Sequence, residues 1–232
     1  MLAEFGVRDA VSYAVYRLLG RSGGWLGFYR YVFHAQPVAA VPRVPPRRAA
    51  GLPVRRLSPG DPALAALGLD AAAQAHRFGQ GAVCLAAFRG EEPLGCIWLC
   101  LGPFREDEVR CRFEPLPAGT ACWDLGVFVR PEHRAGFAFA RLWDAADAFL
   151  RERGVRWSVS RISAFNPASR RAHERLGARP VGTASFLCLG PVQLTVSSLR
   201  PFPHLSLRRD RLPVLRPPVP ELPDPPPAPD GP

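Results

Sequence analysis

The chain has 232 residues, which is enough for one domain with extensions or at most two small domains. It carries 30 basic and 20 acidic residues for a formal charge of +10, and every basic residue is arginine. The lack of lysine and the many Ala, Gly and Pro residues indicate a bacterial genome with GC-rich codons, so the charge is weak evidence for nucleic acid, for which the chain has no recognisable binding motif.

The first 50 residues are predicted to form an N-terminal extension. Residues 7–20 have the pattern of an amphipathic helix, with Val7, Val11, Ala14, Val15, Leu18 and Leu19 on one side. The aromatic stretch that follows, up to residue 33, allows two interpretations. Residues 7–33 either contact a membrane surface or a partner, or they pack onto the main domain or onto a second copy in a homodimer. Residues 37–50 have the Pro- and Arg-rich composition of a linker.

The domain proper is predicted to span residues 51–199. Its first half is predicted to contain a strand at 52–57, helical material at 61–78 and a hairpin of strands 82–88 and 94–101. A charged, half-exposed strand at 105–113 leads to a further strand at 120–129. Two closing strands are expected at 181–189 and 192–199. From residue 200 the Pro-rich composition predicts a disordered tail up to residue 232, because it offers little apolar surface to bury.

The centre of this domain reads as strand, turn, helix, strand and helix. A strand at 123–129 stops at Pro131, and apolar residues at three- and four-residue intervals predict a helix from Arg134 that Gly154 ends. A second strand covers 156–163, and Asn166 with Pro167 opens a short helix. Two parallel strands joined by a crossover helix form a right-handed unit whose helix N-terminus favours an anion.

Two sequence runs in this centre carry a family resemblance. They are V-F-V-R-P-E-H-R, followed by a small-residue turn into a helix, and N-P-A-S-R-R-A-H-E-R-L-G-A. Together they resemble the GCN5-related N-acetyltransferases, the GNAT family. The family's second run has Asn, a small residue three on, Tyr seven on and Gly eleven on, and this chain has Asn166, Ser169, His173 and Gly177 there. Asn166 is also the one asparagine in the chain.

The resemblance implies an α/β (α+β) fold with a mixed, mostly antiparallel sheet, helices on both faces, and two parallel strands that separate at an acyl-CoA site. The residues it assigns to acetyl-CoA are Phe128, Val129, Arg134, Ala135, Gly136, Phe137, Ala138, Phe139, Asn166 and Ser169. Two registers are open for the turn. Counting from Arg134 puts Phe137 and Phe139 where the family has small residues, whereas counting from His133 puts Gly136 and Ala138 there.

For catalysis the resemblance places His173 at the family's Tyr, which protonates the departing CoA thiolate. An ordinary imidazole pKa near 6.5 suits this role. Asp124 and Glu114 are the candidate bases near the expected cleft, and a salt bridge from Asp124 to Arg130 or Arg161 is the alternative. Arg161 and Ser163 either face the acceptor cleft or bond each other.

The leading hypothesis is therefore an acyl-CoA-dependent N-acyltransferase that transfers an acetyl group directly to an amine. A non-catalytic acyl-CoA-binding or interaction module is the alternative. The six cysteines show no zinc-ligand spacing, so free thiols in a reducing cytoplasm and no metal are expected. The first residues lack the features of a signal peptide, and no apolar run approaches the roughly 20 residues of a membrane span.

Overall fold

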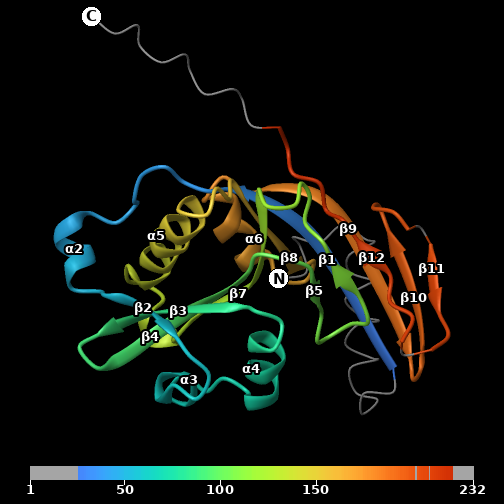
Figure 1. Ribbon diagram of the computed structural model, residues 1–232, viewed down its shortest axis with the longest axis horizontal. Coiled ribbons are helices and arrows are strands. Elements are labelled where there is room, and N and C mark those ends of the chain that lie inside the picture. The colour runs from blue at the N-terminus through green and yellow to red at the C-terminus, as the bar shows by residue number, and fades with distance from the viewer. Residues whose placement is uncertain (1–25, 202, 209, 222–232) are drawn as a thin grey trace, which may run out of the picture.

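A computed structural model describes residues 26–201, 203–208 and 210–221. The amphipathic helix expected at 7–20 lies outside these residues. The described chain forms a mixed nine-stranded sheet in the order β11-β10-β9-β1-β8-β7-β4-β3-β2 and a small sheet in the order β12-β6-β5 (Figure 1). The large sheet contains β1 (Leu26–Pro37), β2 (Val54–Leu57), β3 (Val83–Arg89), β4 (Glu92–Cys100), β7 (Ala121–Val129), β8 (Trp157–Ser163), β9 (Arg179–Leu189), β10 (Val192–Ser197) and β11 (His204–Ser206).

Helices cover both faces of the large sheet, as predicted. On one face α5 (Ala138–Arg151) buries Leu142, Trp143, Ala146 and Leu150 against β3 and β4, and α6 (Pro167–Glu174) lies beside it. The other face packs against α3 (Pro62–Ala66), α4 (Ala71–Phe78) and the small sheet of β5 (Phe104–Arg105), β6 (Arg112–Phe113) and β12 (Val214–Leu215). The Phe113 ring stacks on Trp123 at 4.5 Å, which joins the small sheet to the core.

The parallel pair at the centre of the domain is confirmed. β7 and β8 pair in parallel register from Ala121 with Trp157 to Asp124 with Ser160, and they pair no further along their length. On its other edge β7 has a register shift against β4, because Trp98 lies opposite Gly126 and Leu99 opposite Asp124. Gly126 takes a φ of +136°, which favours glycine. The two strands therefore separate just beyond Asp124.

The expected N-terminal boundary is wrong for the aromatic stretch. β1 is a central strand of the large sheet, antiparallel to β8 and β9 on its two sides. Tyr31, Phe33 and Ala35 are buried on one face of this strand, which explains the aromatic density of the sequence. Residues 26–33 are thus part of the domain and do not form a separate membrane-binding or partner-binding hairpin.

The segment read as a linker is also fixed to the domain. The backbone N–H groups of Arg43 and Val44 donate to the Asp144 carboxylate on α5 at 2.8 and 2.9 Å, and the Arg43 guanidinium pairs with Asp147 at 2.6 Å. A short helix, α2 (Pro46–Ala50), follows. Composition did not reveal this anchoring, because the two carboxylates lie about a hundred residues further along the chain.

Two more predictions are corrected by the pairing of short strands. The single strand expected at 105–113 is instead a loop between two two-residue strands, β5 at 104–105 and β6 at 112–113. Beyond residue 200, β11 pairs with β10 and β12 pairs with β6, and Leu215 is fully buried. The described part of the Pro-rich tail is therefore packed on the domain, because extended proline-containing backbone can still lie along a strand.

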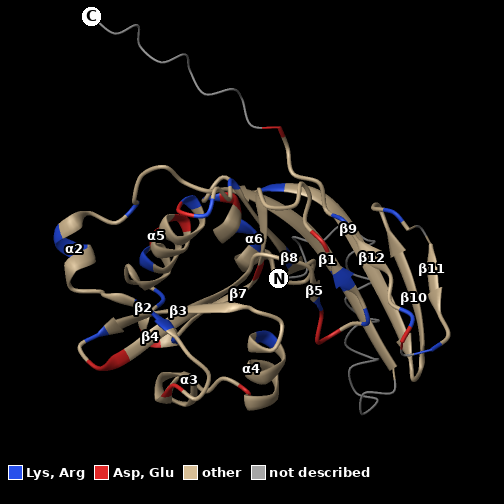
Figure 2. Cartoon of the chain, viewed as in Figure 1, with Lys and Arg blue, Asp and Glu red and all other residues tan. Residues whose placement is uncertain are grey.

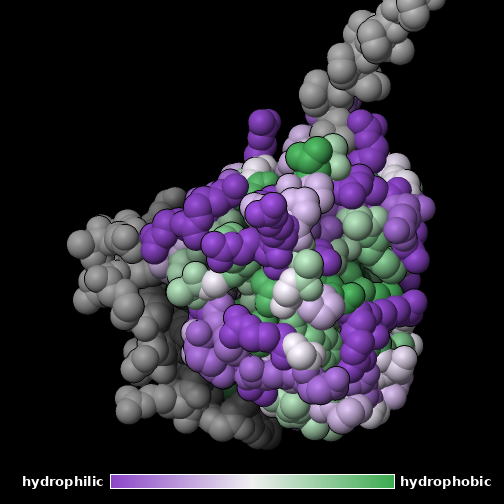
Figure 3. Space-filling view, turned by 90° about the vertical axis from the view of Figure 1, so that its left-hand side faces the viewer, coloured by the Kyte–Doolittle hydropathy of each residue, from purple (hydrophilic) through white to green (hydrophobic). Residues whose placement is uncertain are grey.

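The surface mixes charge and apolar groups. Figure 2 shows arginines on α2, α5 and α6, with acidic residues between them. Figure 3 views the side of the molecule on which α2 lies, where hydrophilic side chains surround smaller hydrophobic areas. All six cysteines are free, as predicted. Within the part of the chain that the structure describes, no helix is both long and apolar enough to cross a membrane.

Candidate active site

The separation of β7 and β8 opens a cavity of about 780 Å³. Its walls come from the far ends of these two strands, the turn before α5, the first residues of α5, and one side of α6. Seven of the ten residues assigned to acetyl-CoA line it, namely Phe128, Val129, Arg134, Gly136, Phe139, Asn166 and Ser169, whereas Ala135, Phe137 and Ala138 do not. Seven of the ten residues thus lie around one cavity and three do not, and the assignment of all ten to acetyl-CoA stays a prediction.

One residue from each of the two possible turn registers lines the cavity. Gly136 lines the cavity, as the register from His133 requires, and Phe139 lines it as well. Phe137 is 41 % exposed, and the guanidinium of Arg48 on α2 lies 5.2 Å from its ring centroid. The bulky side chain nearest the turn thus points away from the cavity, while one phenylalanine still forms part of the cavity wall.

The N-terminus of α5 has no side-chain cap. Its N-cap residue is Phe137, which offers no hydrogen-bond acceptor to the first-turn N–H groups. The first N–H groups of any helix lack intrahelical acceptors and carry partial positive charge, so an uncapped end suits an anion. By contrast, α6 is capped as predicted, because the Asn166 side chain accepts from the Ser169 backbone N–H at 3.0 Å.

Arginines add positive charge to the cavity wall. Arg134 folds back over the end of β7, where its Nε donates to the Val129 carbonyl at 3.1 Å. Arg175, the C-cap residue of α6, lines the opposite wall. Figure 2 shows further basic residues on α5 and α6 around this region. The electrostatic surroundings of the cavity therefore favour a ligand that carries phosphate groups.

Asp124 lies where the two strands separate and is 2 % exposed. One of its carboxylate oxygens accepts from the Gly126 backbone N–H at 2.8 Å, and the other has no partner among the described residues. Burial raises the pKa of this carboxyl to about 7, against the lowering effect of the hydrogen bond from Gly126. Neither of the proposed arginine partners pairs with it, since Arg130 pairs with Glu92 and Arg161 pairs with Glu106.

Arg161 is held by an acidic loop that lies within the range expected to be a strand, 105–113. Its guanidinium makes two hydrogen bonds of 2.6 Å to Glu106 and lies 2.8 Å from Glu108, which also accepts from the Tyr31 hydroxyl at 2.8 Å. Burial alone would raise the pKa of Glu106, but Arg161 lowers it to about 2. Three consecutive acids in an arginine-rich chain were the available sequence signal for this cluster.

The expected protonated state of His173 is not supported. His173 lines the cavity but is only 6 % exposed, and its ring meets Trp143 edge-on at 5.6 Å. Burial, and then the neighbouring His34 on β1, lower the pKa of His173 to about 4. The imidazole is therefore neutral near pH 7, and its Nδ1 has no partner among the described residues.

Glu114 lies outside the cavity. It follows β6 in the small sheet, and its carboxylate pairs with Arg112 at 3.1 Å and Arg216 at 2.8 Å. Ser163 does not bond Arg161 either, since its hydroxyl accepts from the Phe165 backbone N–H at 3.2 Å. The structure thus brings Asp124 and His173 together in one cavity and excludes Glu114, because the short strand before Glu114 belongs to the second sheet.

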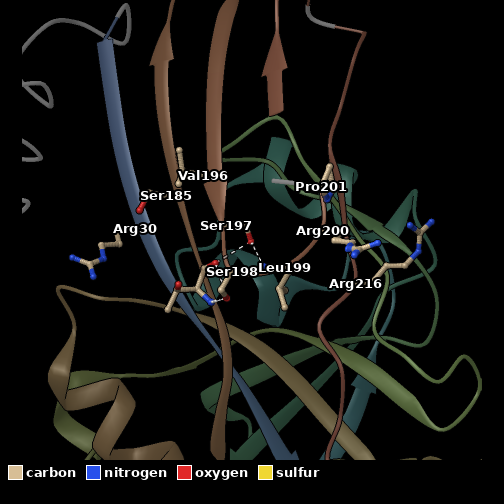
Figure 4. A pocket seen from close by; sticks show the side chains of 10 residues that line it. Arg30, Ser185, Val196, Ser197, Ser198, Leu199, Arg200, Pro201 and Arg216 are labelled. Atoms are coloured by element: carbon tan, nitrogen blue, oxygen red, sulfur yellow. Dashed lines mark hydrogen bonds between the residues drawn. The ribbon is translucent and has the colours of Figure 1, made fainter. Parts of the chain in front are cut away.

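A second hollow, of about 1080 Å³, lies at the end of β10. Figure 4 shows Arg200 and Arg216 close together on one side of the strands and Arg30 on the other. Two of its hydroxyl groups are engaged by the protein, because Ser197 donates to the Thr183 carbonyl at 2.9 Å and Ser198 accepts from the Thr183 N–H at 2.8 Å. No residue of the predicted catalytic set lines this hollow.

The sequence places the chain in a known family. The model of the acetyltransferase (GNAT) domain matches residues 52–179, more than half of the chain, so the chain belongs to the GNAT family. The matched range contains β7, β8, α5 and α6, and it excludes β1, β10, β11 and β12. No characterised protein matches by sequence.

Solved structures with the same fold include a conserved protein of unknown function from Staphylococcus epidermidis, with a TM-score of 0.51 and 11 % identity over 75 % of this chain and 66 % of that one. A tandem GNAT protein of the clavulanic acid biosynthesis pathway gives 0.45 and 19 %, over 66 % and 50 %. A GCN5-related N-acetyltransferase from Kribbella flavida gives 0.45 and 18 %, over 70 % and 59 %. The chain thus spans half to two thirds of the length of these proteins.

Proposed function

We propose that the chain is an acyl-CoA-dependent N-acyltransferase that transfers an acetyl group from acetyl-CoA to an amine, directly and within a ternary complex. One juxtaposition carries the proposal. The uncapped N-terminus of α5 and the buried, partly unpartnered carboxylate of Asp124 belong to the same cavity where β7 and β8 separate. An anion site and a proton acceptor in one cavity are what this transfer requires.

The residues present fit a CoA molecule. The first-turn N–H groups of α5, together with Arg134 and Gly136, would hold the pyrophosphate, and Phe137 leaves room because its side chain points to Arg48. On the edge of β7 that faces β8, beyond their last pair, the backbone of Val129 would bond the pantetheine chain, while Phe128, whose backbone faces Cys96 of β4, lines the cavity; Asn166 and Ser169 line the facing wall. This cavity is also deep enough in the sheet to reach Asp124.

Asp124 is the candidate general base. Acetyl-CoA, when bound, supplies the acetyl group as a reactive thioester. The acceptor nitrogen forms the new C–N bond as the C–S bond breaks, and the amine must lose a proton for this. A carboxylate with a pKa of about 7 is partly ionised at neutral pH and holds an accepted proton well, which matches it to that task.

His173 has a more limited role in this proposal. Because its imidazole is neutral near pH 7, it is a poor proton donor, but a neutral ring still carries one N–H. That N–H would stabilise the departing sulfur by a hydrogen bond. A His173→Gln variant, which retains an N–H donor, is then expected to keep more activity than His173→Phe, whereas equal activities would contradict this role.

A non-catalytic acyl-CoA-binding module is the second candidate. It is favoured by Phe139 in the cavity wall, where the family has a small residue in one register, and by the neutral state of His173. Both candidates predict CoA binding, so they differ only in whether thiol is released when an amine is added.

The test has two stages. Acetyl-CoA at 100 times its Kd should raise the melting temperature, since such a ligand stabilises the folded chain by about 2.7 kcal/mol. Arg134→Glu should abolish this shift, while Arg89→Glu, at the exposed end of β3, should keep it. No shift at millimolar CoA would overturn the cofactor proposal. Thiol release over a panel of primary amines then supports the transferase, and binding without release supports the module.

A further inference from the structure

The short helix α2 carries two arginines beside the N-terminus of α5. Arg47 and Arg48 are both exposed, and the sequence of α2 contains no acidic residue. The Arg48 guanidinium lies 5.2 Å from the ring centroid of Phe137, the N-cap residue of α5. Figure 2 shows that α2 lies next to α5 and that both helices carry arginines. Positive charge therefore extends from the uncapped end of α5 onto a neighbouring helix.

The backbone on both sides of α2 is fixed to α5. Before α2, the N–H groups of Arg43 and Val44 donate to the Asp144 carboxylate, and the Val44 side chain is buried. After α2, Leu52 is buried, and its carbonyl accepts from Arg141 Nε at 3.1 Å. Because this segment is already ordered, a ligand that binds α2 has little conformational entropy of the backbone to remove.

Neither arginine of α2 is neutralised by an acid within the described residues. Arg43, only a few positions earlier, pairs with Asp147 at 2.6 Å, whereas Arg48 contacts the Phe137 ring and Arg47 has no ion pair in the described part of the chain. Like charges that are held close together repel each other, and they raise the local concentration of anions. The two guanidinium groups thus have charge available for a ligand.

CoA carries an anion apart from its pyrophosphate. This is the phosphate monoester on the 3′ oxygen of the adenosine ribose, which has a charge of about −1.5 to −2 near pH 7. The planar guanidinium group binds such a phosphate through two parallel N–H donors. With the pyrophosphate at the N-terminus of α5, the adjoining ribose phosphate needs a cationic partner close to that helix end, and α2 provides two.

We propose that Arg47 and Arg48 bind the 3′-phosphate of CoA and so let the chain distinguish CoA from related thiols that lack this phosphate. The inference rests on the proposed use of CoA as cofactor. It extends the cofactor site to an element that the family model does not include, because that model begins at residue 52. The Phe137 ring would support one face of the Arg48 guanidinium and leave its N–H groups for the phosphate.

The test compares CoA with 3′-dephospho-CoA in calorimetric titrations of the full chain. The two ligands differ only in this phosphate. We expect the wild type to bind CoA about tenfold more tightly, because two exposed charge pairs of typical strength account for about that factor. Arg47→Ala with Arg48→Ala should remove the difference by weakening the binding of CoA alone. Both side chains are exposed, so the melting temperature of the free protein should stay the same.

Two control variants separate this subsite from the rest of the site and from net charge. Arg134→Ala, at the proposed pyrophosphate site, should weaken both ligands equally and keep the ratio of their Kd values. Arg200→Ala with Arg211→Ala removes the same number of charges from exposed positions after β10 and before β12, on the other side of the molecule from α2 (Figure 1). This control should leave both affinities unchanged.

The outcomes distinguish the failure of this inference from the failure of the cofactor proposal. Equal affinities of the wild type for the two ligands would overturn the inference but leave CoA as the cofactor. A preference for CoA that survives in the α2 double variant, or that the control double variant also removes, would overturn it as well. If neither ligand binds at millimolar concentration, the cofactor proposal fails and this inference fails with it.

Discussion

Two helices begin at the candidate active site, and their first turns differ. The N-terminus of α6 is closed by the Asn166 side chain, which accepts from the N–H three residues on. The N-terminus of α5 begins at Phe137, whose side chain is turned away to Arg48. One helix thus satisfies its own backbone, while the other leaves donors for something outside the chain. The comparison separates a helix end that the chain caps itself from one that we propose binds the cofactor, although both line the same cavity.

The proposed general base belongs to neither helix. Asp124 lies on β7, and its free oxygen has no partner in the described chain. A buried polar atom without a partner costs stability, so such an atom in a cavity has a functional explanation more often than a structural one. Binding and chemistry should therefore be separable by substitution.

The largest expected effect is on transfer rate. Asp124→Asn keeps the shape of the side chain but removes the proton acceptor, so we expect a 10²–10⁴-fold lower rate with the best amine of the panel. The CoA-induced rise in melting temperature should persist, because both helix ends are untouched. Loss of CoA binding together with the rate would show that Asp124 supports the fold of the cavity instead.

The same residue should make stability depend on pH. Its folded pKa of about 7 lies above its ordinary value near 3.9, so between these values the folded chain keeps a proton that the unfolded chain has lost. The contribution of Asp124 to the free energy of unfolding therefore falls as pH rises from about 4 to 7, by at most about 4 kcal/mol.

Melts of the wild type and of Asp124→Asn at pH 5 and pH 8 measure this effect. We expect the asparagine variant to gain stability relative to wild type at the higher pH. The lowered pKa of His173 acts in the opposite direction, since its contribution is lost as pH falls from about 6.5 to 4, but it is common to both chains and cancels in the difference. A difference that is independent of pH would contradict the raised pKa.

A negative charge at the N-terminus of α5 tests the contrast between the two helix ends. Phe137→Asp places a carboxylate beside the first-turn N–H groups, which should weaken CoA binding at least tenfold because the carboxylate repels phosphate. Phe137→Ala is the control, as it loses only the contact with Arg48. Calorimetric titration with CoA compares the two; equal affinities would mean that the α5 end is not the phosphate site.

The smallest expected effect is the removal of the α6 cap. Asn166→Ala should lower the free energy of unfolding by about 1 kcal/mol, the usual cost of losing such a cap. The size of the CoA-induced shift should change little, and Asn166→Asp, which restores an acceptor, should recover the stability. A large loss of CoA affinity with unchanged stability would reverse the roles assigned to the two helix ends.

The sequence predicted the βαβ centre of the fold because the signals there are local. Pro131, Gly154 and Asn166 with Pro167 mark ends that the structure confirms within a few residues, and the cavity lies where the two strands were expected to separate. The raised pKa of Asp124 also follows from a carboxylate among apolar strand residues, which was visible in the alternation of β7.

The remaining elements depend on contacts between distant residues. β1 has the composition of a core strand, but its partners lie in β8 and β9, near the other end of the chain. The described residues after 200 pack on the domain because β11 pairs with β10 and β12 pairs with β6. Glu106 and Arg161 become partners through the fold, and Arg161 keeps the pKa of Glu106 low in spite of burial, whereas burial lowers the pKa of His173. The run of three acids marks the acidic loop, but no local pattern identifies Arg161 as its partner.

The position of β1 has a consequence for synthesis of the protein. Tyr31 pairs with Ser163 and Leu26 with Leu189, so this first described strand has no edge to join until β8 and β9 have left the ribosome. At 5–20 residues per second that delay is on the order of ten seconds. During it the aromatic side chains of β1 are exposed, and the sheet then closes by insertion of an early strand between two late ones. Assembly should therefore be slow and sensitive to aggregation, because its last pairing joins the most distant parts of the chain.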